Sequence, residues 1–176
     1  MELVTDRLVL RPPSVADAHD ALVLLQDPEV ARWNPAPAVV DEDSAVAWCQ
    51  SGADWSSGDH ATWHGVEPAT DRLVVNISVF AFDADHASAK IGYRVMPQRR
   101  RQGYAREALR AVTEWAFTER PIARIQLEHT VANVASCRVA LGAGYRLEGT
   151  LRGAYRTLDG VRHDDHVHGR LATDPS

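Results

Sequence analysis

A stretch with three consecutive arginines, QRRRQGYAREAL from Gln98 to Leu109, carries the residue types best suited to binding an anion. The first turn of a helix has unpaired N–H groups and the positive end of the helix dipole, and a glycine before it lets the backbone approach a ligand closely. Arg100 and Arg101 would add charge-assisted hydrogen bonds. The stretch therefore predicts a compact phosphate site. The alternative is a solvated charged turn in front of an ordinary helix.

The overall charge argues against a nucleic-acid partner. The 176 residues include 19 Lys and Arg against 24 Asp and Glu, a formal net charge of -5, whereas a duplex-binding surface needs many cations to neutralise phosphates. The glycines are too few for a Walker loop, and no Lys-Ser/Thr pair follows the arginines. A nucleic-acid-binding module that uses the arginines remains the weakest of the alternatives.

Composition and cysteine use favour one soluble domain over residues 1–176. The sequence shows neither an apolar run that would span a membrane nor a signal peptide, so we expect no membrane partner and a cytoplasmic location. Cys49 and Cys137 are interpreted as small core residues in a reducing compartment, without a disulfide.

Hydrophobic periodicity predicts a fold of the α/β class, a three-layer arrangement with a mixed, mostly antiparallel sheet flanked by helices. The arginine loop would lie at one end of that sheet, where ligands collect. Expected helices cover residues 14–25, 27–33, 41–54, 104–119 and 133–144. Expected strands cover residues 7–12, 61–67, 72–82, 88–97 and 123–131, followed by a hairpin of 145–155 with 162–171.

Four segments resemble the GNAT acetyltransferases, and in particular the RimJ/RimL-like branch that acetylates ribosomal-protein N-termini. The pattern Arg100-x-x-Gly103-x-Ala105 is similar to the family's Arg/Gln-x-x-Gly-x-Gly/Ala motif. The four segments occur in the family's order and at its spacing; they are TDRLVLRPPSVADA, DPEVARW, IGYRVMPQRRRQGYAREAL and NVASCRVALGAGYRLEGTLR.

The resemblance implies the GNAT acyl-CoA N-acyltransferase fold, with acetyl-CoA as donor and no metal. The main chain of Val95 and Met96 would pair with the pantetheine arm, and Asn133 would contact that arm. Arg101 departs from the family, because many members have glycine there. The residues implied to bind the pyrophosphate are Arg100, Arg101, Gln102, Gly103, Tyr104, Ala105 and Arg106.

Transfer from a thioester to an amine requires a deprotonated amine, a donor for the oxyanion and stabilisation of the leaving thiolate. The resemblance places Ser136 of Asn133-Val-Ala-Ser136 near the thiol, as catalytic residue and as part of the cofactor site; the alternative is that it caps the helix. The backbone N–H of Met96 is the expected oxyanion donor. For the general base we consider Glu128 and Glu67, each of which is otherwise a solvated strand carboxylate.

A glutamate of the penultimate strand is the base proposed for RimL-like enzymes, but Tyr155 stands at the matching position here. A tyrosine with a pKa near ~10 is a poor base, so Tyr155 is assigned to the acceptor site together with Trp33. Trp48, Trp55 and Trp63 are further candidates for an acceptor wall, although each is more often a core residue.

The segment HDDHVH raises the question of a metal site. His166 and His168 share one strand face with Asp164, but the spacing of structural zinc sites is absent. We therefore expect an edge strand that carries polar residues and no metal. His129 is expected to be structural.

The primary hypothesis is an N-acetyltransferase that acts on a primary amine by direct attack in a ternary complex. The alternative is a non-catalytic acyl-CoA-binding sensor or scaffold on the same fold, which the missing glutamate at Tyr155 motivates. Dimers are common in the branch that the chain resembles, so a homodimer is left open.

Overall fold

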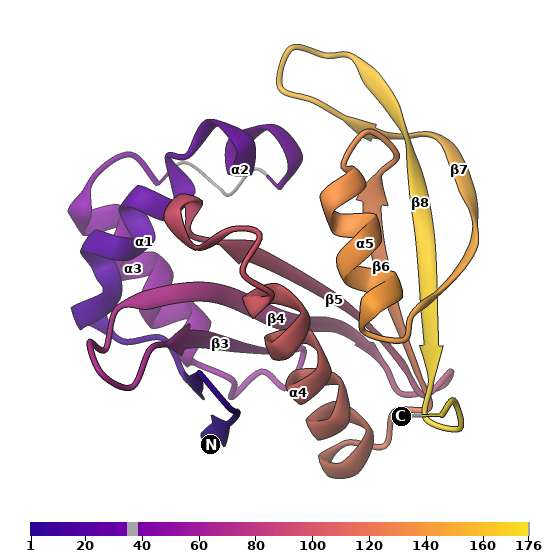
Figure 1. Ribbon diagram of the computed structural model, residues 1–176, viewed down its shortest axis with the longest axis horizontal. Coiled ribbons are helices and arrows are strands. Elements are labelled where there is room, and N and C mark those ends of the chain that lie inside the picture. Colours follow the sequence, from indigo (N-terminus) through magenta and orange to yellow (C-terminus); the bar gives the residue numbers. More distant parts are fainter. Residues whose placement is uncertain (35–38, 176) are drawn as a thin grey trace.

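An eight-stranded mixed sheet with helices on both faces forms the molecule (Figure 1), which confirms the predicted fold class. The computed structural model describes residues 1–34 and 39–175. The strand order is β1-β2-β3-β4-β5-β6-β8-β7. The strands are β1 (Leu3–Val4), β2 (Val9–Arg11), β3 (His60–Val66), β4 (Leu73–Asp83), β5 (Ser88–Val95), β6 (Arg124–Thr130), β7 (Arg146–Arg156) and β8 (Arg162–Leu171). The helices are η1 (Val15–Asp17), α1 (Ala18–Leu25), α2 (Pro28–Trp33), α3 (Glu42–Ala53), η2 (Pro97–Arg99), α4 (Tyr104–Glu119) and α5 (Val134–Gly142).

Alternation along β3 shows how the three layers are built. Successive side chains of a strand point to opposite faces. Trp63 therefore points to one face, where its ring lies 4.6 Å from that of Trp115 on α4. His64 points to the other face and stacks on Trp48 of α3, with ring centroids 5.6 Å apart. Helices α1 and α3 thus cover one face, whereas α4 and α5 cover the other (Figure 1).

The connection through α4 makes β5 and β6 parallel neighbours, but their pairing is short. Only Ser88–Lys90 of β5 pairs with Arg124–Gln126 of β6. Beyond these residues the two strands diverge, while β5 stays paired with β4 along its whole length. The divergence leaves one edge of β5 without a strand partner in the middle of the sheet.

The final hairpin forms as predicted, but its position in the sheet corrects one expectation. Strand β8 pairs with β6 on one side and with β7 on the other. The segment HDDHVH therefore belongs to an interior strand and not to an edge strand. His168 is fully buried as a result.

Residues 35–38 of the proline-rich segment NPAPAVV, which we interpret from the sequence as a loop, lie outside the described part of the chain. Among the described residues no helix is long and apolar enough to cross a membrane.

A buried ionic network at Asp17 joins β2, η1 and β3. The two carboxylate oxygens of Asp17 accept hydrogen bonds from Arg11 at 2.9 and 2.8 Å, and one of them also accepts from the Ser14 amide and from Nδ1 of His64. Burial alone would raise the pKa of Asp17, but the bonds from Arg11 and His64 outweigh it and hold that pKa below its ordinary value. Burial of His64 lowers its pKa, so a neutral imidazole donates to Asp17.

Replacing Asp17 by alanine should cost about 3–5 kcal/mol of unfolding free energy, because the buried His64 would lose its partner and Arg11 would keep only the exposed Asp71 as a carboxylate partner. The depressed folded pKa means that this stabilisation is present above about pH 4, the unfolded pKa, and is lost as the pH falls below it. Urea denaturation between pH 3 and 7 measures both effects. Asp6→Ala is the control, since Asp6 is exposed, and equal stability of the two variants would contradict the assignment.

Candidate active site

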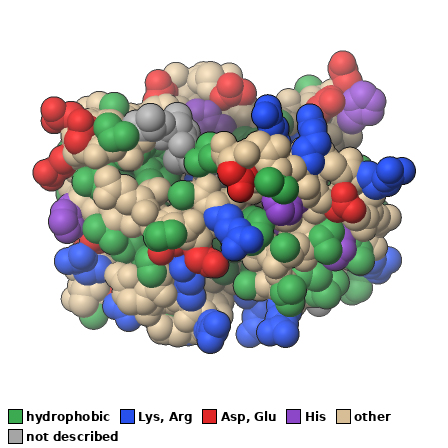
Figure 2. All heavy atoms as spheres, turned by 90° about the horizontal axis from the view of Figure 1, so that it is seen from above, with side chains coloured by type: hydrophobic (Ala, Val, Ile, Leu, Met, Phe, Trp, Pro, Cys, Tyr) green, Lys and Arg blue, Asp and Glu red, His purple; other side chains and the backbone are tan. Residues whose placement is uncertain are grey.

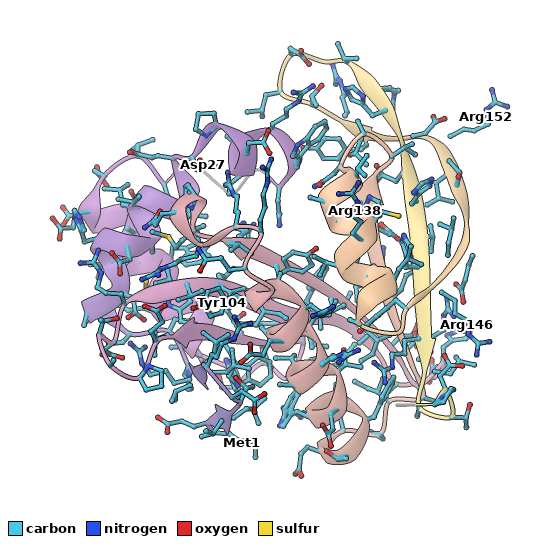
Figure 3. The ribbon with its side chains drawn as sticks, viewed as in Figure 1. Met1, Asp27, Tyr104, Arg138, Arg146 and Arg152 are labelled. Carbon is cyan, nitrogen blue, oxygen red and sulfur yellow. The ribbon has the colours of Figure 1, made fainter. Side chains whose placement is uncertain are left out.

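A cleft of about 1570 Å³ opens where β5 and β6 diverge. Strands β5 and β6, the end of α2, the start of α4 and the first turns of α5 line it. Figure 3 shows Asp27 before α2 and Tyr104 at the start of α4 on one side of the divergence, with Arg138 of α5 on the other. The volume exceeds the about 300–1,000 Å³ of an ordinary small-molecule pocket, so two substrates can be accommodated together.

The start of α4 has the backbone geometry that an anion site at a helix N-terminus requires. Gly103 precedes the helix with φ of 87°, and no side chain caps the first turn of this 16-residue helix. The amides of Tyr104, Ala105 and Arg106 are thus left for a ligand, as expected for a phosphate site at a helix N-terminus. Arg101 also has a positive φ, 61°. A glycine would adopt that conformation without strain, which explains the family preference for glycine at this position.

The three arginines differ in their partners. Arg99 donates to Glu67 at 2.7 Å, and Arg100 is ion-paired with Asp27. Arg101 is exposed and contacts no acid in the part of the chain that the structure describes. We expected the Arg100 side chain to bind phosphate, but Asp27 already pairs with it and would compete. Arg101 is therefore the better placed of these two arginines for a phosphate.

The side chains of Gln102 and Arg106 make contacts outside the cleft. The side-chain amide of Gln102 donates to the Gln98 carbonyl at 3.0 Å, and the Arg106 side chain lies against Gly142. Neither side chain lines the cleft. The carboxylate of Glu67, a candidate base, already accepts two hydrogen bonds, one from Tyr104 Oη at 3.0 Å and one from Arg99.

The backbone of β5 corrects the expected oxyanion donor. The Met96 amide donates to the Val74 carbonyl at 2.9 Å, so it is already occupied. Because antiparallel pairing alternates, the amides of Tyr93 and Val95 point to the other edge of β5, where the strands diverge. The Tyr93 carbonyl does face that way, because the side chain of Asn34 donates to it. At the end of β5 it is therefore Val95, and not Met96, whose N–H faces the cleft.

Helix α5 places Ser136 opposite β5. Asn133 caps this helix, accepting a hydrogen bond from the Ser136 amide at 3.1 Å. Ser136 is thus not the cap, and its hydroxyl lies 3.0 Å from Tyr93 Oη instead. Burial raises the pKa of Tyr93 to about 12, so the phenol keeps its proton at neutral pH and can donate to Ser136.

Trp33 and Tyr155 both line the cleft at its other end. Tyr155 Oη donates to the Arg32 carbonyl at 2.8 Å, and Trp33 contacts His163 edge-on at 6.2 Å between ring centroids. These contacts join α2 to the final hairpin. Of the other tryptophans considered for this wall, Trp55 and Trp63 pack in the core and Trp48 stacks on His64, so none of them lines it.

Glu128 also faces the cleft, but its carboxylate is partly used. Lys90 Nζ lies 2.9 Å from Oε1, and the side-chain amide of Gln126 donates to the same oxygen. Asp165 of β8, which pairs with Thr130 of β6, is a second carboxylate of this wall and is buried. Two carboxylates therefore line this end of the cleft, one paired with Lys90 and the other with a pKa raised by its burial.

Sequence reasoning missed Tyr93, Arg94, Arg138 and Asp165 as residues of the site. Arg94 donates to the side chains of Asn34 and Asn76 at 2.9 and 3.1 Å, and its burial lowers its pKa to about 10. Because Tyr93 lies two residues before Val95 on the same strand, strand alternation could have predicted that both face the same way. The distance from Tyr93 to Ser136, however, depends on how α5 packs on the sheet.

Comparison with known proteins identifies the family. A model of the acetyltransferase (GNAT) domain matches residues 7–146, so the chain belongs to the GNAT acetyltransferases. This membership makes it an N-acetyltransferase and implies acyl transfer from acetyl-CoA.

Two curated relatives come from bacilli. The uncharacterised N-acetyltransferase YoaA of Bacillus subtilis (strain 168) is 29% identical over 167 residues, which cover 94% of each chain. The uncharacterised N-acetyltransferase p20 of Bacillus licheniformis is 26% identical over 85% of each chain.

Solved structures share the fold at low sequence identity. The ribosomal-protein acetyltransferase RimL in complex with coenzyme A has a TM-score of 0.85 at 21% identity, with 96% of each chain covered. The microcin C7 self-immunity acetyltransferase MccE, in complex with acetyl-CoA and AMP, has a TM-score of 0.83 at 20% identity, with 95% of this chain and 93% of MccE covered.

Two substitutions of Arg101 should separate its side chain from its backbone. Arg101→Ala and Arg101→Gly should both weaken coenzyme A binding by about tenfold, because each removes one charge-assisted hydrogen bond. Arg101→Gly should be more stable than Arg101→Ala by about 1 kcal/mol, because glycine adopts the positive φ without strain. Titration calorimetry and thermal denaturation measure the two quantities.

Arg152→Ala is the matched control for charge, since Arg152 points away from the molecule (Figure 3). Unchanged coenzyme A affinity in both Arg101 variants would show that the backbone alone forms the cradle.

Proposed function

We propose that the chain transfers an acetyl group from acetyl-CoA to the α-amine of a protein or peptide, by direct attack in a ternary complex, as a member of the RimJ/RimL-like branch. The observation that carries this proposal is the Tyr93–Ser136 hydroxyl pair, which joins β5 to α5 beside the free edge of β5. The motif Asn133-x-x-Ser136 and the structural similarity to RimL support the branch.

In this proposal the donor lies along the free edge of β5, with its pyrophosphate at the start of α4. The Arg101 guanidinium and the amides of Tyr104, Ala105 and Arg106 would hold the phosphates. Val95 would bind the pantetheine arm through its main chain, and the side-chain NH₂ of Asn133 is free for the same arm because only its oxygen caps α5.

The reaction forms a C–N bond between amine and acetyl carbon and breaks the C–S bond of the thioester. The Val95 amide would stabilise the negative charge that develops on the carbonyl oxygen. Ser136 would donate a hydrogen bond to the leaving sulfur, because its own oxygen can accept a hydrogen bond from the Tyr93 hydroxyl. The thiolate takes up a proton as coenzyme A departs, and the amine loses one to water.

The ionisation of the acceptor favours an α-amine over a lysine side chain. With a pKa of about 7.7–8.0, roughly one α-amine in six to eleven is neutral at pH 7, whereas for a lysine near ~10.4 the fraction is below about 0.1%. An α-amine acceptor therefore needs little help from a general base. Because Lys90 and Gln126 occupy one oxygen of Glu128, we assign to Glu128, together with Asp165, the attraction of a cationic acceptor in place of the predicted role as base.

Variants of the hydroxyl pair test the mechanism. Ser136→Ala should lower kcat by about 100-fold, the smaller end of the effect of a positioned proton donor, with little change in the Kd of coenzyme A. Tyr93→Phe should lower kcat less, and the double variant should match Ser136→Ala, because Tyr93 acts through Ser136. Additive losses in the double variant would show that Tyr93 acts independently.

A mass-spectrometric screen tests the acceptor class. Peptides with a free α-amine and no lysine should be acetylated, and matched peptides with a blocked N-terminus and one lysine should not. Products from the lysine peptides alone would overturn the α-amine proposal. Binding of coenzyme A without thiol release from any acceptor would instead establish the sensor alternative, for which the absence of a carboxylate at Tyr155 is the motivating feature.

A further inference from the structure

Four potential metal ligands meet beneath α5, on the face of the sheet that this helix covers. They are His129 of β6, Cys137 of α5, and His166 and His168 of β8, and one donor atom of each lies within 4.8 Å of the others. Strand register explains the histidines, because His129 pairs with His166, and His168 lies two residues further along the same face. Cys137 is the residue after Ser136 on the covering helix.

A hydrogen bond to the backbone fixes the tautomer of His129 and leaves its other ring nitrogen with a lone pair in the cluster. Nδ1 of His129 lies 2.9 Å from the Thr130 carbonyl, which can only accept, so Nδ1 carries the proton and Nε2 is an acceptor. That Nε2 accepts a hydrogen bond from Nε2–H of His168 at 3.1 Å, a contact that an ion bound by both nitrogens would replace. The donation of the outer ring nitrogen to a backbone carbonyl is also the arrangement that orients histidine ligands in metal sites.

Two ring nitrogens of the cluster have no protein partner. Nδ1 of His166 and Nδ1 of His168 are both buried without a hydrogen bond to any described residue. Leaving such an atom unpaired costs about 1–3 kcal/mol.

The spacing is close to that of a tetrahedral zinc site. With Zn–N of about 2.0–2.1 Å and Zn–S of about 2.3 Å, neighbouring donors of a tetrahedron are roughly 3.3–3.6 Å apart. The Nε2 pair of His129 and His168, at 3.1 Å, lies near this edge length. Cys137 and His166 are only partly buried, so rotation of their side chains can close the wider separations and gives an ion a route from solvent.

We propose that His129, Cys137, His166 and His168 bind one Zn²⁺ ion that joins α5 to strands β6 and β8. Three neutral imidazoles and one thiolate suit zinc, a borderline-soft ion with N and S ligands. The ion would fix the first turns of α5, which carry Ser136 into the cleft, and it would hold Cys137 as a bound thiolate. The donors come from three elements, so no linear motif marks the site.

Cobalt substitution tests the proposal on the full-length chain without a polyhistidine tag. Titration of chelator-treated protein with Co²⁺ should produce, at one ion per chain, a thiolate-to-cobalt charge-transfer band and strong visible bands of tetrahedral cobalt, and Zn²⁺ should abolish both. Cys137→Ser should lose the charge-transfer band. His166→Gln should weaken Zn²⁺ binding by more than about 100-fold, because even the loss of an outer-shell partner costs about 10–100-fold.

Cys49→Ala is the matched control, since Cys49 is the other cysteine and lies buried on α3; it should keep both bands. Thermal unfolding of each metal-free variant shows whether it is folded, and Zn²⁺ should raise the Tm of wild type and of Cys49→Ala only. Absence of the charge-transfer band from the folded wild type, or Zn²⁺ affinity unchanged in Cys137→Ser and His166→Gln, would overturn the proposal.

These readouts are separable from catalysis. The cobalt spectrum and the zinc stoichiometry do not depend on acetyl transfer, and the screen of acceptor peptides does not depend on bound metal. An inactive protein that binds zinc would therefore contradict the proposed function alone, whereas an active protein without the cobalt bands would contradict the metal site alone.

Discussion

The divergence of β5 from β6 is the constraint on which the rest of the site depends. Parallel pairing lasts only from Ser88 to Lys90 on β5, whereas the antiparallel ladder with β4 holds β5 straight beyond that point. The outward amides of β5 are therefore left without a strand partner in the interior of an open sheet. A parallel strand needs a crossover, and this crossover is α4, whose uncapped first turn begins at the mouth of the same opening. One topological feature thus brings the free strand edge and the phosphate cradle together.

The charges around the cleft are arranged to make a small anion site on an acidic protein. Glu67 and Asp27 neutralise Arg99 and Arg100 and draw the loop toward the β3–β4 connection and α2. These pairs position the loop, and they leave Arg101 without a carboxylate partner among the described residues. Basic and acidic side chains are interspersed on the face of the molecule shown in Figure 2, without a continuous basic band among its described residues. Such a surface suits one bound cofactor better than a polyanion.

Local signals in the sequence predicted the elements well where a physical reason lies within a few residues. The Ser14–Asp17 capping box, the Asp27 cap before Pro28, and the turn at Gly160 with φ of 87° are all of this kind. The expectations that failed depended on long-range pairing. The Met96 amide bonds to β4, and the HDDHVH strand lies inside the sheet because β8 inserts between β6 and β7. No pattern within either segment specifies its neighbour.

The sequence by itself determined the α/β class, the helix that opens on Gly103 and the chemistry of its first turn, because helix caps, glycine conformations and hydrophobic periodicity act over only a few residues. Only the tertiary structure decided which amide of β5 is free, which arginine lacks a carboxylate, that Tyr93 meets Ser136, and that three histidines and Cys137 converge beneath α5. These features depend on strand order, register and helix docking, which arise from packing summed over the whole chain.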